Sequence, residues 1–134
     1  MRLSICVLAV LLAAGCGCDE HGSDNPFVCE TPEDCYPGID PADLPGDVVC
    51  QDRVEGGYCT HLCTTDDECC SVEGECAEGF VQVCSPLESS PEKYCFYSCE
   101  GMEDAEAFCA EYAHSSFHCR STGGGTENRM VCLP

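Results

Sequence analysis

Apolar positions divide the chain into one long apolar run near its start and a series of short runs further along. Residues 3–14 (LSICVLAVLLAA) are apolar apart from one serine and one internal cysteine. The later runs span only a few residues and lie between Gly, Pro, Asp and Ser, which is typical of short strands. We expect these strands at Val48–Gln51, Phe80–Cys84, Tyr94–Ser98, Phe117–Arg120 and Arg129–Leu133.

One segment has the spacing of a helix. Met102, Ala105, Phe108 and Tyr112 recur at helical intervals, and acidic side chains gather where this segment begins. Negative charge is favourable at the amino-terminal end of a helix because the helix dipole is positive there. The pattern therefore predicts one helix from Met102 to about His114.

Glycine and proline mark two connections between these elements. The segment Pro37–Gly46 contains three prolines and two glycines, so we expect a loop there. Gly123–Gly125 separates the last two expected strands and fits the connection of a hairpin. Short hairpins and one helix are the elements that the pattern supports.

Composition changes this picture by adding a constraint on stability. The 134 residues include 17 Cys and only 5 Lys and Arg against 25 Asp and Glu, for a net charge of −20. Such an acidic chain repels nucleic acid. Few aliphatic residues and a high net charge are typical of disorder, so we expect disulfides, rather than a hydrophobic core, to make the chain fold. Disulfides require an oxidising compartment.

The amino-terminal run has the layout of a secretory signal. Met1 and Arg2 supply a positive start, the apolar run follows, and small residues precede Cys16. The run is too short to cross a bilayer, since a spanning helix needs about 20 residues. We expect residues 1–15 to be a signal peptide and residues 16–28 to be a polar tether.

The end of this signal suggests a lipid anchor. Leu11-Leu12-Ala13-Ala14-Gly15-Cys16 resembles the lipobox of bacterial lipoproteins. The resemblance implies cleavage before Cys16, acylation of Cys16 with palmitate-type chains, and attachment to the membrane, the outer membrane being favoured by Gly17. The alternative is an ordinary signal cut after Gly15, which would release a freely secreted protein.

Cysteine spacings recur along the rest of the chain. Cys29–Cys35 and Cys63–Cys69 are both C-x5-C, and the spacing of Cys59 and Cys63 recurs at Cys95 and Cys99. The recurrence predicts Cys-rich modules at residues 29–63, 63–99 and 99–134. Fourteen cysteines are candidates for seven bridges: Cys29, Cys35, Cys50, Cys59, Cys63, Cys69, Cys70, Cys76, Cys84, Cys95, Cys99, Cys109, Cys119 and Cys132. Their spacing leaves the pairing open, and Cys18 is left unpaired or joins two molecules.

A second resemblance rests on residues 57–69. The letters from Gly57 to Cys69 follow the pattern G-x-C-T-x-x-C-T-x-D-x-x-C, which resembles the repeat of Cys-rich secreted bacterial lipoproteins and surface proteins. The resemblance implies an envelope location and a disulfide-rich fold but no activity. We therefore expect a small disulfide-rich fold of short β-hairpin modules, with one short helix near residues 102–114.

Other candidate chemistry is sparse. Glu111, His114 and His118 could hold a metal if the helix continued, or could be unconnected surface groups. The acidic stretch 64–68 could bind calcium, or Thr65 and Asp66 could start a helical turn. A thiolate cluster for metal storage is the rival use of the cysteines. No catalytic motif is present, so no catalytic, cofactor or metal residue is assigned.

The predicted function is therefore that of a non-enzymatic protein. We expect a lipid-anchored Cys-rich protein of the cell envelope, with a structural or interaction role and an unidentified protein partner. The alternatives are a freely secreted disulfide-rich binding module or inhibitor, and a weak extracellular binder of divalent metal. Acylation of Cys16 separates the anchored protein from the secreted one.

Overall fold

The computed structural model describes residues 27–123 and 128–134. The expected signal peptide (1–15), the lipidation site Cys16, the unpaired Cys18 and most of the tether (16–28) lie outside these residues. Gly124 and Gly125 of the expected hairpin connection also lie outside them. Gly123 is described and has a φ of +73°, a left-handed conformation that suits glycine in a turn.

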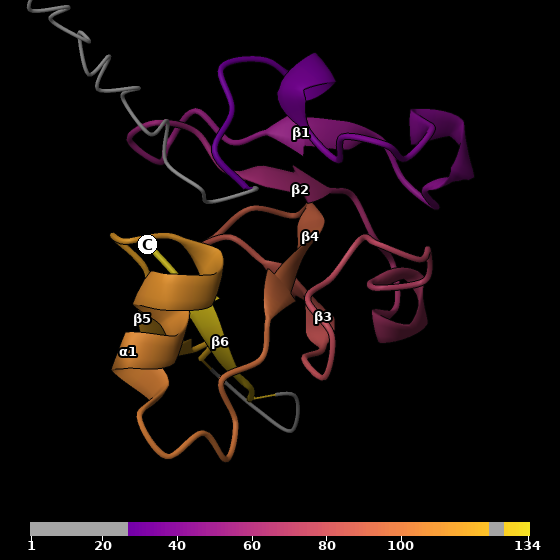
Figure 1. Ribbon diagram of the computed structural model, residues 1–134. Coiled ribbons are helices and arrows are strands. Elements are labelled where there is room, and N and C mark those ends of the chain that lie inside the picture. Colours follow the sequence, from indigo (N-terminus) through magenta and orange to yellow (C-terminus); the bar gives the residue numbers. More distant parts are fainter. Residues whose placement is uncertain (1–26, 124–127) are drawn as a thin grey trace, which may run out of the picture.

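Three antiparallel hairpins follow one another along the chain (Figure 1). Strand β1 (Val48–Cys50) pairs with β2 (Cys59–His61), and β3 (Gln82–Pro86) pairs with β4 (Lys93–Tyr97). The third hairpin joins β5 and β6, which span His118–Ser121 and Met130–Leu133. The predicted fold class, a small disulfide-rich fold of short hairpins with one short helix, is confirmed.

A helical turn precedes each hairpin. The 3-10 helices η1 (Pro32–Asp34) and η3 (Asp66–Glu68) precede the first two hairpins. Before the third, α1 (Ala105–Phe108) continues into the π-helix η4 (Cys109–Ala113). A further 3-10 helix, η2 (Pro41–Asp43), lies within the expected loop Pro37–Gly46. Turn followed by hairpin is thus the unit that repeats, and we call these units the first, second and third repeats.

Six disulfides follow one scheme. In each repeat the first cysteine bonds to the third and the second to the fourth, so the turn is tied twice to its hairpin. The pairs are Cys29–Cys50 and Cys35–Cys59, Cys63–Cys84 and Cys69–Cys95, and Cys99–Cys119 and Cys109–Cys132. The third and fourth cysteines lie opposite each other across the hairpin in every repeat. The seventh bridge, Cys70–Cys76, is an addition to the second repeat.

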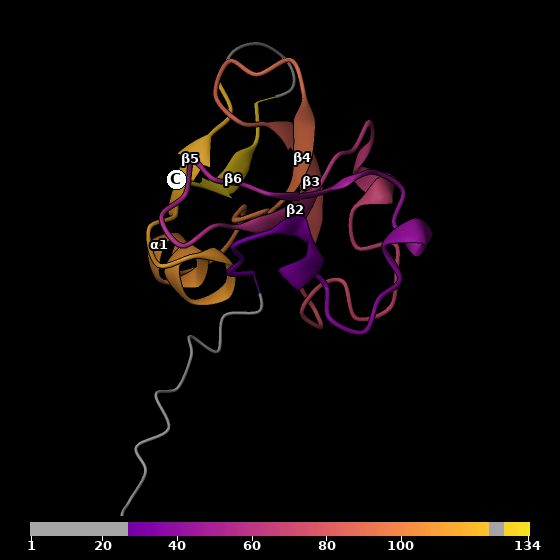
Figure 2. The ribbon, with the colours of Figure 1, turned by 90° about the horizontal axis from the view of Figure 1, so that it is seen from above.

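Isolated β-bridges join one repeat to the next. The bridge between Ser98 and Val131 connects the second repeat to the third. The bridge between Leu62 and Tyr94 connects the first repeat to the second. These β-bridges place the hairpins against one another, as the two perpendicular views show (Figures 1 and 2).

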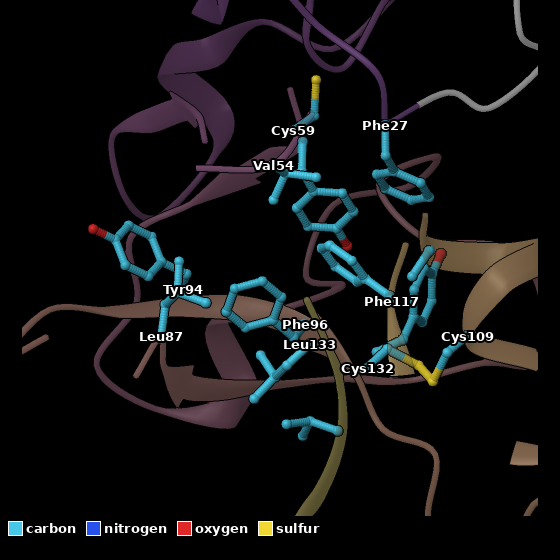
Figure 3. Close-up of a cluster of buried hydrophobic side chains, with 14 of the residues drawn as sticks. Phe27, Val54, Cys59, Leu87, Tyr94, Phe96, Cys109, Phe117, Cys132 and Leu133 are labelled. Atoms are coloured by element: carbon cyan, nitrogen blue, oxygen red, sulfur yellow. A yellow bond between two sulfur atoms is a disulfide. The ribbon is translucent and has the colours of Figure 1, made fainter. Parts of the chain in front are cut away.

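Aromatic side chains fill the space where the repeats meet (Figure 3). All five Tyr and all five Phe of the chain belong to one core cluster: Phe27, Tyr36, Tyr58, Phe80, Tyr94, Phe96, Tyr97, Phe108, Tyr112 and Phe117. At its centre the ring of Tyr58 lies 4.7 Å from that of Phe117 and 5.8 Å from that of Phe96. These rings come from the first, third and second repeats respectively.

The expectation that this chain lacks a hydrophobic core is therefore wrong. Counting aliphatic residues underestimates the apolar surface of this chain, because each aromatic side chain buries about 150–250 Å². No single repeat has enough such residues to enclose a core. The three repeats share one, to which Tyr58, Phe96 and Phe117 contribute from different hairpins.

The helix is shorter than its periodicity predicts. It begins at Ala105 rather than Met102, because the N–H of Met102 bonds to the carbonyl of Cys99 in a turn and Gly101 has a φ of +72°. The side chain of Asp104 then accepts a hydrogen bond from the N–H of Ala107 at 3.1 Å and caps the first turn. The helical segment ends at Ala113, one residue before the predicted end.

The expected strands are confirmed in place, with ends that shift by one or two residues. Strand β2 was not predicted at all. Its three residues, Cys59–His61, are all buried, so they lack the alternation of apolar and polar positions that marks a half-exposed strand.

Two adjacent glycines provide a test of the close packing in the first repeat. A Cβ on Gly57 would lie 2.0 Å from the carbonyl oxygen of Cys29, whereas the nearest atom to a Cβ on Gly56 is 3.9 Å away. Both glycines have a positive φ, so both alanine variants carry the same kind of backbone strain. We expect Gly57→Ala to lower the free energy of unfolding by about 1–3 kcal/mol more than Gly56→Ala, as overpacking does. Urea unfolding with the disulfides intact measures this difference, and equal effects would contradict it.

Candidate functional site

A histidine and a glutamate form a buried pair between the first and second repeats. His61 lies on β2, and Glu75 lies in the segment between Cys70 and Cys76. Both side chains have an exposed fraction of 0%. The imidazole Nε2 donates to Glu75 Oε1 at 2.9 Å, and Nδ1 donates to the carbonyl oxygen of Leu62 at 2.9 Å. Two oxygen acceptors require two N–H donors, which only the imidazolium form of His61 supplies.

The glutamate is equally well matched to a charged state. Glu75 Oε1 also accepts from the N–H of Cys70 at 2.7 Å, and Oε2 accepts from the N–H of Val72 at 3.1 Å. A buried carboxylate is stable when backbone N–H groups and an opposite charge surround it. The segment 70–76 is thereby folded around its own carboxylate.

Burial and pairing act in opposite directions on the two pKa values. Burial alone would lower the pKa of His61, but its hydrogen bonds to Glu75 and Leu62 raise it above the ordinary 6.5. Burial alone would raise the pKa of Glu75, but its hydrogen bonds from His61 and the backbone lower it below the ordinary 4.5. The charged pair is therefore favoured in the fold.

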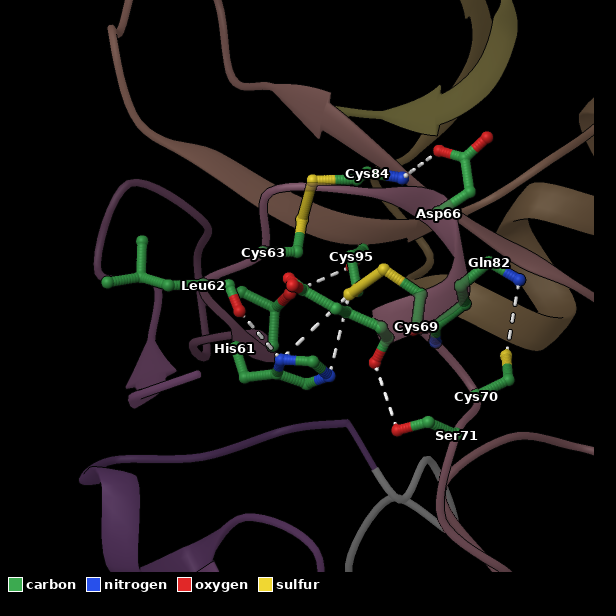
Figure 4. The surroundings of a disulfide bond; sticks show 12 residues. His61, Leu62, Cys63, Asp66, Cys69, Cys70, Ser71, Gln82, Cys84 and Cys95 are labelled. Atoms are coloured by element: carbon green, nitrogen blue, oxygen red, sulfur yellow. Dashed lines mark hydrogen bonds between the residues drawn. A yellow bond between two sulfur atoms is a disulfide. The ribbon is translucent and has the colours of Figure 1, made fainter. Parts of the chain in front are cut away.

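The imidazole of His61 lies against a disulfide (Figure 4). His61 Nε2 is 3.5 Å from Sγ of Cys95, which is bonded to Cys69. His61, Glu75 and Cys95 lie close enough to surround a metal ion. However, both imidazole nitrogens already donate hydrogen bonds and the sulfur is in a disulfide, so this cluster joins two repeats and offers no ligand set.

A polar groove of about 500 Å³ lies between the turn of the second repeat and the hairpin of the third. Its lining combines hydroxyls, carboxylates and two cations: Thr64, Thr65, Asp66, Asp67, Cys84, Ser85, Pro86, Lys93, Thr122, Gly123 and Arg129. Asp66 accepts from the N–H of Cys84 at 2.9 Å and forms an ion pair with Arg129. Burial would raise the pKa of Asp66, but these two partners lower it.

Lys93 differs from Arg129 in its surroundings. Its ammonium group makes no hydrogen bond or salt bridge with any side chain in the part of the chain that the structure describes. It lines the same groove as Arg129, and the two come from different repeats. Of the five Lys and Arg residues of the chain, two therefore line this groove, beside the carboxylates of Asp66 and Asp67.

The acidic stretch 64–68 forms a helical turn, as one of its two interpretations predicted. The carboxylate of Glu68 accepts from both the N–H and the hydroxyl of Thr64, at 2.6 and 2.7 Å. These bonds lower the pKa of Glu68. Asp34 does the same in the first repeat, accepting from the N–H of Thr31 at 2.8 Å, which lowers its pKa too. The carboxylates of Glu68 and Asp66 thus already accept hydrogen bonds from other groups of the fold. The side chain of Thr65 makes no hydrogen bond that caps the turn.

The residues considered for a metal near the helix are not brought together. The helical segment ends at Ala113, so His114 and His118 do not share a helical face. His114 is buried, and its Nδ1 accepts from the N–H of Ser116 at 3.1 Å. His118 is exposed, and its Nδ1 lies 2.7 Å from Glu106 rather than near Glu111.

The cysteines considered for a thiolate cluster are bonded in pairs. In each repeat three sulfur atoms lie within 4.8 Å of one another, because the two crossed bridges pack side by side. All fourteen cysteines from Cys29 to Cys132 form disulfides. Sulfur in a disulfide is not a thiolate, which is the form that binds metal.

Comparison of the chain with protein-family models, with curated proteins and with solved structures finds no match. Within residues 27–123 and 128–134, no helix is both long enough and apolar enough to cross a membrane. Neither the His61–Glu75 pair nor the groove was found from the sequence. Their members are far apart in the chain, and the cysteine spacing that marks the repeats carries no signal for them.

The His61–Glu75 pair predicts a pH dependence of stability. Because the pKa of His61 is higher in the fold than in the unfolded chain, protonated His61 contributes to the free energy of unfolding. This contribution is fully present below pH 6.5 and is lost as the pH rises through the folded pKa. Because the pKa of Glu75 is lower in the fold than in the unfolded chain, ionised Glu75 also contributes to the free energy of unfolding. This contribution is fully present above pH 4.5 and is lost as the pH falls through the folded pKa. The contribution of the pair to the free energy of unfolding is therefore largest between pH 4.5 and 6.5.

Two substitutions measure this contribution. Near pH 6, Glu75→Gln leaves a buried imidazolium without its counter-charge and costs about 3–5 kcal/mol in urea unfolding with the disulfides intact. Glu106→Gln is the matched control, because it breaks the exposed pair with His118 and costs at most about 1 kcal/mol. Equal costs for the two variants would show that the buried pair is unimportant.

Proposed function

We propose that this chain is an exported, lipid-anchored protein of a bacterial cell envelope that binds or organises other molecules without catalysis. The observation that carries the proposal is that all fourteen cysteines from Cys29 to Cys132 are in disulfides. Such dense cross-linking persists in oxidising compartments and serves small exported scaffolds. The signal-like residues 1–15 supply the route of export.

The anchor is Cys16, at the end of the lipobox-like stretch. Phe27, where the described chain begins, is buried against Tyr58 and Tyr97 in the aromatic core. Phe27 follows Cys16 by eleven positions, and an extended chain of that length reaches at most about 40 Å. The domain is therefore held near the membrane surface. Two or three acyl chains on Cys16 make that attachment durable, and Gly17 favours the outer membrane.

The surface chemistry supports binding rather than catalysis. The thiols of the described residues are oxidised, so they are not nucleophiles. His61 is enclosed with both nitrogens in use, and His118 is paired with Glu106 on the surface. General acid–base chemistry needs a titratable group within reach of a substrate. Neither histidine stands in a cleft.

The groove with Lys93 and Arg129 is the candidate binding site. Its walls come from the second and third repeats, and Cys84 in its lining is bonded to Cys63. A covalently fixed wall loses little conformational entropy when a ligand binds. Arg129 is already paired with Asp66, so Lys93 and the neighbouring hydroxyls are the groups that suit an anionic group on a polar ligand, such as a carboxylate or phosphate.

Intact mass tests the anchor and the bridges together. The full chain, expressed in a bacterium that processes lipoproteins, is expected to begin at Cys16, to carry acyl chains, and to partition into detergent. Reduction of its seven bridges should add about 14 Da, one hydrogen for each cysteine. Cys16→Ser should abolish acylation and leave the reduction shift unchanged. A wild-type mass without acyl groups would refute the anchor and leave the secreted alternative.

Titration with inorganic phosphate and with acetate tests the groove. Chemical shifts of backbone amides are expected to change most at Thr64, Thr65, Thr122 and Gly123, which line it. Lys93→Gln should weaken these changes because it removes the unpaired cation. Arg53→Gln is the control, since Arg53 is a cation outside the groove that pairs with Glu88. Shift changes that Lys93→Gln leaves intact would exclude the groove as the anion site.

A further inference from the structure

The bridge Cys70–Cys76 differs from the other six disulfides. It lies outside the crossed scheme of the repeats, and its cysteines are 6 residues apart, against 20–26 in the others. A short loop removes little entropy from the unfolded chain, so this bridge contributes least to the stability of the fold. Both of its cysteines are partly exposed, whereas each of the other bridges has at least one buried cysteine.

The backbone at Cys70 is held in an unfavourable conformation. Its φ is +60°, in the left-handed region that residues other than glycine seldom adopt. The preceding residue, Cys69, is buried and bonded to Cys95. Opening Cys70–Cys76 would relieve the strained residue, while the adjacent bridge keeps the chain attached to the hairpin. The change would be confined to residues 70–76.

One sulfur of this bridge is prepared to carry negative charge. The N–H of Gln82 donates to Sγ of Cys70 at 3.2 Å (Figure 4). A hydrogen bond to sulfur stabilises the thiolate and makes that sulfur the better leaving group. Cys76 is therefore the sulfur that an incoming thiolate attacks.

We propose that Cys70–Cys76 is a thiol–disulfide exchange site for dithiol reductants, which open it while the other six bridges stay closed. A thiolate of the dithiol attacks Sγ of Cys76, a new sulfur–sulfur bond forms, and the electron pair of the broken bond goes to Sγ of Cys70. The second thiolate of the dithiol then attacks the first sulfur of the same dithiol, which is bonded to Cys76 in the mixed disulfide. This attack releases Cys76 as a thiolate. The dithiol leaves as a cyclic disulfide, and its two protons pass to the two cysteines.

Opening this bridge loosens the joint between the first two repeats. Glu75 is positioned by the N–H groups of Cys70 and Val72, and its carboxylate holds His61 of β2. Without the bridge, the segment that presents Glu75 is no longer closed into a loop and is held only by the backbone at its two ends. Exchange at Cys70–Cys76 thus weakens an ion pair that joins two repeats, and it does so whether or not the protein is anchored to a membrane.

Charge around the site selects the reductant. Glu73, between the two bridged cysteines, and Glu78, two residues after Cys76, are both exposed. A thiol that carries an additional negative charge is repelled by these carboxylates and by the net charge of the chain. Uncharged dithiols are therefore the preferred class.

Alkylation mapping of the folded full chain tests the proposal. The protein is incubated with graded dithiothreitol, quenched, alkylated and mapped by peptide mass. Cys70 and Cys76 are expected to be labelled at about one tenth or less of the dithiothreitol concentration that labels any of the other twelve bridged cysteines. If another pair is labelled first, or if all fourteen are labelled together, the proposal is overturned.

A double variant and a pair of monothiols sharpen the test. The double variant Cys70→Ser, Cys76→Ser should remove the early labelling and leave unchanged the order in which the other six bridges open. If the variant does not fold, the order in which the wild-type bridges open still decides. At low salt, the uncharged 2-mercaptoethanol should react at this bridge several-fold faster than the anionic 2-mercaptoethanesulfonate. Added salt should reduce this difference in rate, because it screens the repulsion. Equal rates at low salt would refute the charge selection.

The link to the ion pair has its own readout. After selective opening of the bridge, the pKa of His61 measured by NMR should fall toward its ordinary value of 6.5. An unchanged His61 titration would show that the bridge and the ion pair are independent.

Discussion

In each repeat two crossed disulfides tie a helical turn to a two-stranded hairpin, and the remaining contacts depend on that attachment. A lone hairpin of three to five residues per strand is marginal in water, and a single 3-10 turn is no better. Joined at two points, the turn and hairpin hold their side chains in a defined arrangement. The same arrangement recurs three times although the turn is η1, η3 or the longer α1–η4 segment.

Covalent and non-covalent interactions act at different levels of this structure. Every disulfide closes within one repeat, so none of them joins two repeats. The joints are instead the packed rings of Tyr58, Phe96 and Phe117, the buried pair of His61 and Glu75, and the ion pair of Asp66 and Arg129. A fold with so many cross-links thus still relies on packing and ion pairs for its overall shape.

The sequence was informative about local elements and uninformative about what joins them. Alternation and turn residues located five of the six strands, and β2 escaped because its residues are all buried. Four cysteines allow three pairings, so the crossed scheme could not be chosen from spacing. The aromatic core was missed because its rings are scattered over the whole chain, and Asp66 and Arg129 of the groove are 63 residues apart. Contacts at such separations leave no periodic signal.

The crossed pairing has a consequence for biogenesis. During export the first and second cysteines of a repeat emerge together, and oxidation in order of emergence would join Cys29 to Cys35 and Cys50 to Cys59. The register of the hairpin favours the same error, since Cys50 and Cys59 lie directly opposite each other. The native set is reached only when such early bonds are reshuffled, which takes minutes to hours without help. Oxidation alone is therefore not enough to give the native pairing, and exchange between early disulfides is a required step of folding.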